Sequence, residues 1–165
     1  QPKLNNTMST TPVAYTAKVN HSVLHKNIAQ ITAAESLQHL PAQIASLNWL
    51  LGHLVFSRIE ILRDFNTNTD HLLPNEQFTT YQTLYDRGTT AYDHPADNYI
   101  DFETLKAQFD ATQPLYLGVI EQLSATDEAT IKNLGRMNFY NFHESYHIGQ
   151  MGIIRKLLGH QGAIK

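Results

Sequence analysis

The chain has 165 residues, a formal net charge of −3 and no cysteine, and apolar and charged residues make up 42% and 16% of it. This length and balance predict one globular domain and exclude an intrinsically disordered chain. The acidic balance argues against a nucleic-acid-binding protein, and the lack of cysteine excludes disulfides, thiolate metal sites and a cysteine nucleophile.

The two ends and the hydropathy pattern give further expectations. Residues 1–12 are mostly polar, so we expect a flexible tail followed by a single domain at residues 13–165. No apolar run reaches the roughly 18–20 residues that a membrane span requires. We therefore expect no membrane partner and a cytoplasmic location.

The first two periodic segments are long enough to be helices. Apolar spacing predicts a first helix from about Lys18 to Gln38. A second is predicted from Pro41, a favourable first-turn residue, to about Asp64. This second helix is apolar around most of its circumference, which indicates burial on several sides.

A long connection follows, at residues 65–99. It contains a polar loop, a possible short helix at 74–86 and an irregular stretch. Connections of this length are commonly functional or mobile. Tyr81, Tyr85 and Tyr92 either wall a pocket or cover the end of the bundle, and the usual behaviour of amphipathic aromatics favours the second interpretation.

Two more helices complete the predicted fold. The third runs from about Asp101 to Leu123, with Pro114 expected to kink or break it. Residues 124–135 are expected to form a linker that has room for one helical turn, before a last helix over residues 138–159. Four principal helices with one long crossover predict an all-α four-helix bundle.

The last predicted helix carries two histidines at metal-ligand spacing. His143 and His147 are four residues apart, so their side chains emerge one turn apart on one face, close to Phe139, Tyr146 and Ile154. Burying imidazoles there without partners costs about 1–3 kcal/mol per unsatisfied group. A divalent metal ion suits this spacing, and hydrogen-bonded core histidines are the alternative interpretation. A metal site would need a third ligand from elsewhere.

A narrow strip of small and polar residues on the second helix supplies that ligand. On a buried helix, such a strip predicts a cavity. His53 lies in its middle and is the predicted third ligand, and Glu60 is the catalytic candidate because burial near a metal would shift its pKa. The candidate pocket residues beside them are Ser46, Trp49, Ser57 and Gln150.

Three other features of the predicted helices point less strongly to a function. His21 and His25 repeat the four-residue spacing, but they lie at the edge of an apolar stripe, where histidines are usually solvated. A metal role for this pair is disfavoured, and a place at the mouth of a pocket is a further alternative. Glu144 projects away from the two histidines beside it and is expected on the surface. Gly149 and Gly152 are expected on an outward face, where they leave room for another helix, including one from a second subunit.

Two segments resemble a known family. Residues 48–53 (Asn-Trp-Leu-Leu-Gly-His) and 143–150 (His-Glu-Ser-Tyr-His-Ile-Gly-Gln) are similar to the DinB/YfiT-like superfamily, and the likeness extends over nearly the whole chain in helix order and spacing. Members are four-helix bundles with a three-histidine metal site. The resemblance implies that His53, His143 and His147 bind a divalent metal, most often nickel or zinc, and it implies a homodimer.

The resemblance also implies an activity. Characterised relatives include thiol S-transferases and a maleylpyruvate isomerase, which use low-molecular-weight thiols such as bacillithiol or mycothiol. We therefore expect a small-molecule substrate and a thiol cosubstrate, with metal-dependent hydrolysis as the alternative chemistry. A non-catalytic metal-binding stress-response module is a hypothesis of a different class. A structural bundle with fortuitous histidines is the least favoured.

Overall fold

The computed structural model describes residues 11–123 and 128–164. These residues form six α-helices and no strand. The helices are α1 (Pro12–Ile28), α2 (Ala33–Ser36), α3 (Leu47–Asp64), α4 (Asn75–Tyr85), α5 (Phe102–Gln122) and α6 (Glu128–Leu157). Most of the expected N-terminal tail, residues 1–10, lies outside the described residues.

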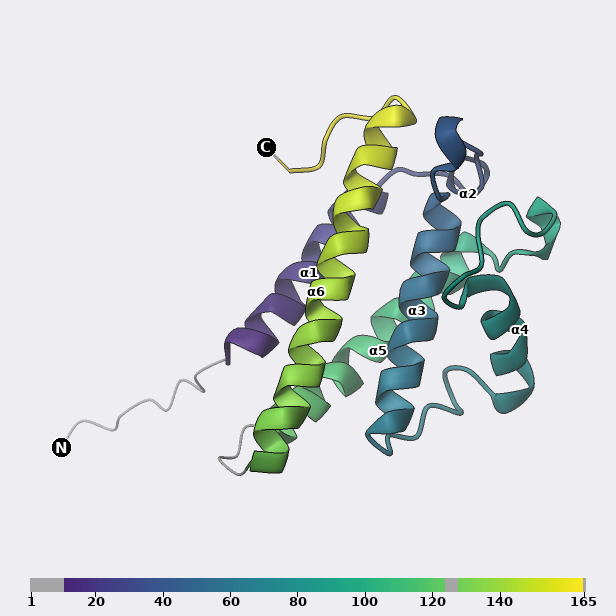
Figure 1. Ribbon diagram of the computed structural model, residues 1–165. Helices are drawn as coiled ribbons and strands as arrows, with labels where there is room; N and C mark the ends of the chain where they lie inside the picture. The colour runs from purple at the N-terminus through teal and green to yellow at the C-terminus, as the bar shows by residue number, and fades with distance from the viewer. Residues whose placement is uncertain (1–10, 124–127, 165) are drawn as a thin grey trace.

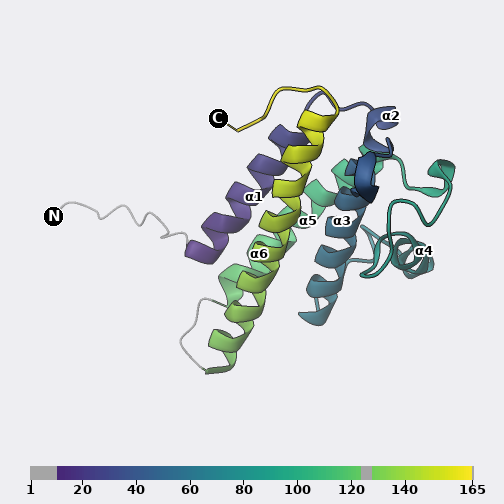
Figure 2. The ribbon, with the colours of Figure 1, turned by 45° about the horizontal axis from the view of Figure 1, so that its top comes forward.

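The four long helices form a bundle, with α4 in the crossover between α3 and α5. α6 packs along α1 and α5 packs along α3, while contacts between α1 and α5 and between α3 and α6 close the ring. Both ribbon views show α6 beside α1, and α4 on the outer side of α3 (Figure 1, Figure 2). The predicted all-α bundle with a long crossover is confirmed. No helix in the described part of the chain is both long and apolar enough to cross a membrane.

α3 lies at the centre of the core, as its sequence predicts. Leu50, Leu51 and Phe56, on different sides of the helix, are all buried, and so is His53. The helix begins later than predicted, because Pro41 opens only a short 3-10 turn at residues 41–43. α3 thus presents His53 from a rigid and fully packed element.

α1 differs from its predicted range of 18–38. It begins at Pro12, where the hydroxyl of Thr11 accepts a hydrogen bond from the first turn, and it ends at Ile28. Gln30 then adopts a left-handed conformation with φ of 65°, and Thr32 caps the separate short helix α2. The prediction was too long because apolar spacing continues through this turn and no glycine or proline marks it.

Two expectations about α5 and α6 are also corrected. Pro114 lies inside α5 without ending it. Phe109 before the proline and Tyr116 after it are both fully buried, so both halves of the helix pack into the core. α6 begins at Glu128, so residues 128–135 of the expected linker are helical, while 124–127 lie outside the described residues.

Candidate metal centre

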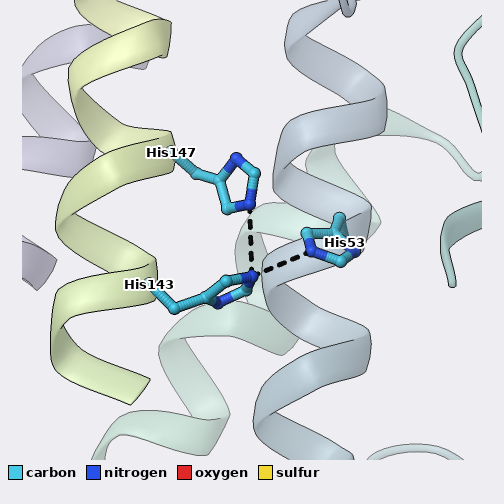
Figure 3. A group of neighbouring side chains, drawn as sticks. All are labelled: His53, His143 and His147. Atoms are coloured by element: carbon cyan, nitrogen blue, oxygen red, sulfur yellow. Dashed lines mark hydrogen bonds between the residues drawn. The ribbon is translucent and has the colours of Figure 1, made fainter. Parts of the chain in front are cut away.

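Three histidines meet between two facing helices; one is buried and two are partly buried. His53 comes from α3, and His143 and His147 come from successive turns of α6 (Figure 3). The Nε2 atom of His143 lies 3.0 Å from Nε2 of His53 and 3.2 Å from Nε2 of His147. Tetrahedral coordination at ordinary Zn–N lengths separates ligand nitrogens by about 3.3–3.4 Å. The three predicted ligands could therefore hold a metal ion with little movement.

A backbone carbonyl sets the orientation of His53. Its Nδ1 lies 2.7 Å from the carbonyl oxygen of Tyr85, which can only accept, so Nδ1 carries the proton and donates it. Tyr85 is the last residue of α4, where helix carbonyls lack partners within the helix. Nε2 of neutral His53 therefore presents a lone pair toward the other two histidines.

Gln150 sets the orientation of His147 in the same way. Nδ1 of His147 donates to Oε1 of Gln150 across 2.7 Å, which leaves the lone pair of its Nε2 facing His143. His143 has at most one Nε2 proton to share between two lone-pair acceptors. Hydrogen bonds among these three nitrogens cannot satisfy all of them, whereas one cation can accept all three lone pairs.

His143 has one more buried nitrogen, which is not among the three that converge. Its Nδ1 is buried and has no hydrogen-bond partner among the described residues. Burial, reinforced by the neighbouring imidazoles, lowers the pKa of His143 to about 4, and burial also lowers the pKa values of His53 and His147. All three are consequently neutral at pH 7, which is the form that binds metal.

The motif at residues 48–53 supports His53 through one direct contact and through two contacts with Tyr85. The Trp49 ring stacks on the His53 ring with centroids 4.9 Å apart. A Cβ atom at Gly52 would lie 2.2 Å from the Tyr85 ring, so only glycine lets that ring pack against α3. Asn48 accepts a hydrogen bond from the Tyr85 hydroxyl at 3.0 Å. These contacts fix the end of α4 whose carbonyl orients His53.

The other predicted pocket residues have different outcomes. The Ser46 hydroxyl caps α3 by accepting from the backbone of Trp49, so it has a structural role. Ser57 is buried one turn beyond His53. Glu60 is half-buried, and no hydrogen bond joins it to a histidine in the described part of the chain. Burial, helped by nearby Asp86, raises the pKa of Glu60, as predicted for a group in this position.

Two residues near the histidines were not predicted. The exposed Arg87, just after α4, lowers the pKa values of His53 and His143 by its positive charge. Tyr140 lies edge-on to His143 with ring centroids 6.4 Å apart. The three-residue spacing of Tyr140 and His143 could have revealed their common face, whereas Arg87 lies in an irregular loop without periodicity.

Glu144 is not on the surface, contrary to prediction. It is buried and pairs with the buried Arg58 of α3 through both guanidinium Nε and Nη2, the latter 3.0 Å from Oε2. The guanidinium also donates to Gln113 at 2.7 Å and lies over the Phe109 ring. The pair therefore joins α6 to α3 and α5 directly behind His143.

The faces of α6 explain this error. Phe139 and Tyr146, which the sequence places around the histidines in one apolar stripe, are 63% and 58% exposed. The histidines thus lie at the border between an exposed apolar face and the buried face, and Glu144 falls on the buried side. Gly152, expected to face outward, lies against Asn27 of α1.

Comparison with known proteins gives one match. The family model described as the DinB superfamily matches residues 18–151, a region that includes all three converging histidines. No curated protein and no solved structure matches the chain.

Proposed function

The chain belongs to the DinB superfamily, and on that premise we propose that it is a metal-dependent enzyme that adds a low-molecular-weight thiol to small electrophiles. The observation that carries the proposal is the convergence of three neutral imidazole nitrogens, two of them with lone pairs fixed by hydrogen bonds. We propose nickel or zinc as the ion, because imidazole nitrogen suits both.

The donor set fits a catalytic site better than a structural one. Three protein ligands leave at least one coordination position free for a thiol or water, whereas structural zinc sites use four protein ligands. When bound, the ion lowers the pKa of a coordinated thiol or water and so supplies a nucleophile at neutral pH. His53, His143 and His147 hold it, and Tyr85 and Gln150 orient two of these ligands.

Groups around the triad have complementary roles in the proposed reaction. Arg87 is an exposed cation that attracts acidic small molecules toward the histidines. Glu60, whose pKa is raised by burial, takes or returns the proton in the proposed reaction. In the transfer, the thiol sulfur forms a bond to an electrophilic carbon. The leaving group departs with its electron pair, and the thiol proton passes to Glu60 or solvent.

Metal-dependent hydrolysis is the second candidate, because Glu60 could take a proton from water as it would from a thiol. A direct test uses protein reconstituted with nickel or zinc. One assay follows the loss of free thiol when a low-molecular-weight thiol and a small alkyl halide are added. A separate assay follows the hydrolysis of small esters. Thiol loss that requires both metal and His147 supports transfer. Ester hydrolysis alone supports the hydrolase. If neither reaction is observed, the enzymatic role is contradicted and a non-catalytic metal-binding module is favoured.

We also propose that the protein is a homodimer formed through the exposed face of α6. That face is apolar and lies beside the histidines; its large exposed residues are Phe139, Phe142, Tyr146, Ile153 and Leu157. Contiguous exposed apolar surface of this kind commonly marks a protein interface. Light scattering after size-exclusion chromatography should give twice the chain mass, and Phe142→Glu should give the monomer. A monomeric wild-type protein at high concentration would contradict this.

A further inference from the structure

A second group of metal-ligating side chains lies between α1 and α5. Nε2 of His21 lies 2.8 Å from Oδ1 of Asp110, and Nε2 of His25 lies 2.6 Å from the same oxygen. The two imidazole centroids are 4.7 Å apart. The sequence predicted solvated histidines here, and the side chains are indeed partly exposed, but they share a carboxylate from the facing helix.

Neighbouring packing holds this group in place. The His21 ring stacks nearly parallel on the ring of Phe109, with centroids 5.8 Å apart and an angle of 9° between the planes. Phe109 is fully buried and precedes Asp110 in α5. The stacking therefore fixes the position of His21 relative to the carboxylate, while His25 follows one turn later on α1. All three donors are therefore presented by long helices, two by α1 and one by α5.

The charge of the group is suitable for a cation. With both imidazoles in the neutral form that binds metal, the group has a net charge of −1, and all three side chains are reached by solvent. The nearby positive charge of Arg58 is paired with Glu144, so it opposes a cation only weakly. Two histidines and one carboxylate form a donor set that proteins use for divalent transition metals.

We propose that His21, His25 and Asp110 form a second divalent-metal site, on the outer surface of the bundle and weaker than the histidine triad. Coordination needs donor atoms about 3.3 Å apart, so these partly exposed side chains have to separate by roughly half an ångström. Each Nε2 also has to lose its hydrogen bond to Asp110, with its proton moving to Nδ1. Both requirements lower the affinity relative to the triad. An ion there would link α1 directly to α5.

The alternative is that Asp110 and the two histidines form only a hydrogen-bonded cluster. Zn²⁺ titration followed by NMR of the histidine imidazoles distinguishes the two, because each ring reports its own binding. We expect the His21 and His25 resonances to shift together, at Zn²⁺ concentrations at least tenfold above those that saturate the triad. The same shift should persist in His147→Ala. The result therefore does not depend on whether the histidine triad binds metal.

Matched variants make the test specific to this site. In His25→Ala and in the near-isosteric Asp110→Asn, the His21 response should move to at least tenfold higher Zn²⁺. In His71→Ala, which removes an exposed histidine elsewhere, it should not move. Circular dichroism confirms that each variant is folded. The proposal is overturned if His21 and His25 do not respond to millimolar Zn²⁺. It is equally overturned if the His21 response is unchanged in both site variants.

Discussion

The molecule contains two histidine clusters with the same local sequence pattern and different chemistry. Each has two histidines four residues apart and a third group from a facing helix. In the cluster at His21, that third group is a carboxylate, which accepts from both rings and leaves the cluster satisfied without metal. In the triad it is another imidazole, His53, so lone pairs face one another. Spacing alone does not distinguish the two, whereas the third partner does.

The two clusters are joined through the core. Glu144 follows His143 in the chain and pairs with Arg58, whose guanidinium lies 4.0 Å from the centroid of the Phe109 ring. The same ring stacks on His21. The buried ion pair is therefore the shared support of both clusters, and changing it should have the largest effect.

Glu144→Ala should lower the free energy of unfolding by about 3–5 kcal/mol, because it leaves the Arg58 charge buried without its partner. Urea denaturation measures this. Glu121→Ala, at an exposed glutamate of α5, is the control and should change stability by less than about 0.5 kcal/mol. A loss below 1 kcal/mol in Glu144→Ala would show that the pair does not support the bundle.

Gly52→Ala should affect the triad and leave the His21 cluster unchanged. The new methyl group would overlap the Tyr85 ring and displace the carbonyl that orients His53. We expect a loss of about 1–3 kcal/mol in stability, together with weaker metal binding. Gly149→Ala, where a Cβ meets open space on α6, should leave stability equal or higher. Equal metal affinity in Gly52→Ala and wild type would contradict this role of Tyr85.

Gln150→Ala tests the orientation of His147 without changing a ligand. Loss of a hydrogen bond that orients a metal-bound histidine typically weakens metal affinity 10–100-fold. Competition with a chromogenic chelator measures the change, and Gln82→Ala, at an exposed glutamine of α4, serves as the control. Affinity within twofold of wild type would mean that Gln150 does not set the tautomer of His147.

The metal-free protein should lose stability as the pH falls from about 6.5 to about 4. The folded pKa of His143 is about 4, below the unfolded value of 6.5, so between these values the unfolded state binds more protons. One such group contributes at most about 1.4 kcal/mol per pH unit. Denaturation of wild type and His143→Gln at pH 7 and pH 5 checks this. The drop should be smaller in the variant, and equal drops would contradict a neutral, buried His143.

The sequence predicted the bundle and the triad because both depend on helical periodicity. The spacing of His143 and His147 and the polar strip around His53 were sufficient to bring the three together. The environment of Glu144 was missed because α6 has two apolar faces, one buried and one exposed, which the helical projection merged into one. The partner of His53 was missed because it is a backbone carbonyl, and the identity of Tyr85 gives no signal for it.

Metal content tests the central claim most directly. The wild-type protein, His53→Ala, His147→Ala and the control His71→Ala would be dialysed against a dilute chelator, which removes weakly bound ions, and measured by elemental analysis. We predict close to one nickel or zinc ion per chain in wild type and His71→Ala, and almost none in the two triad variants. A wild-type protein without metal after reconstitution, or equal metal in all four, would contradict a metal centre at the three histidines.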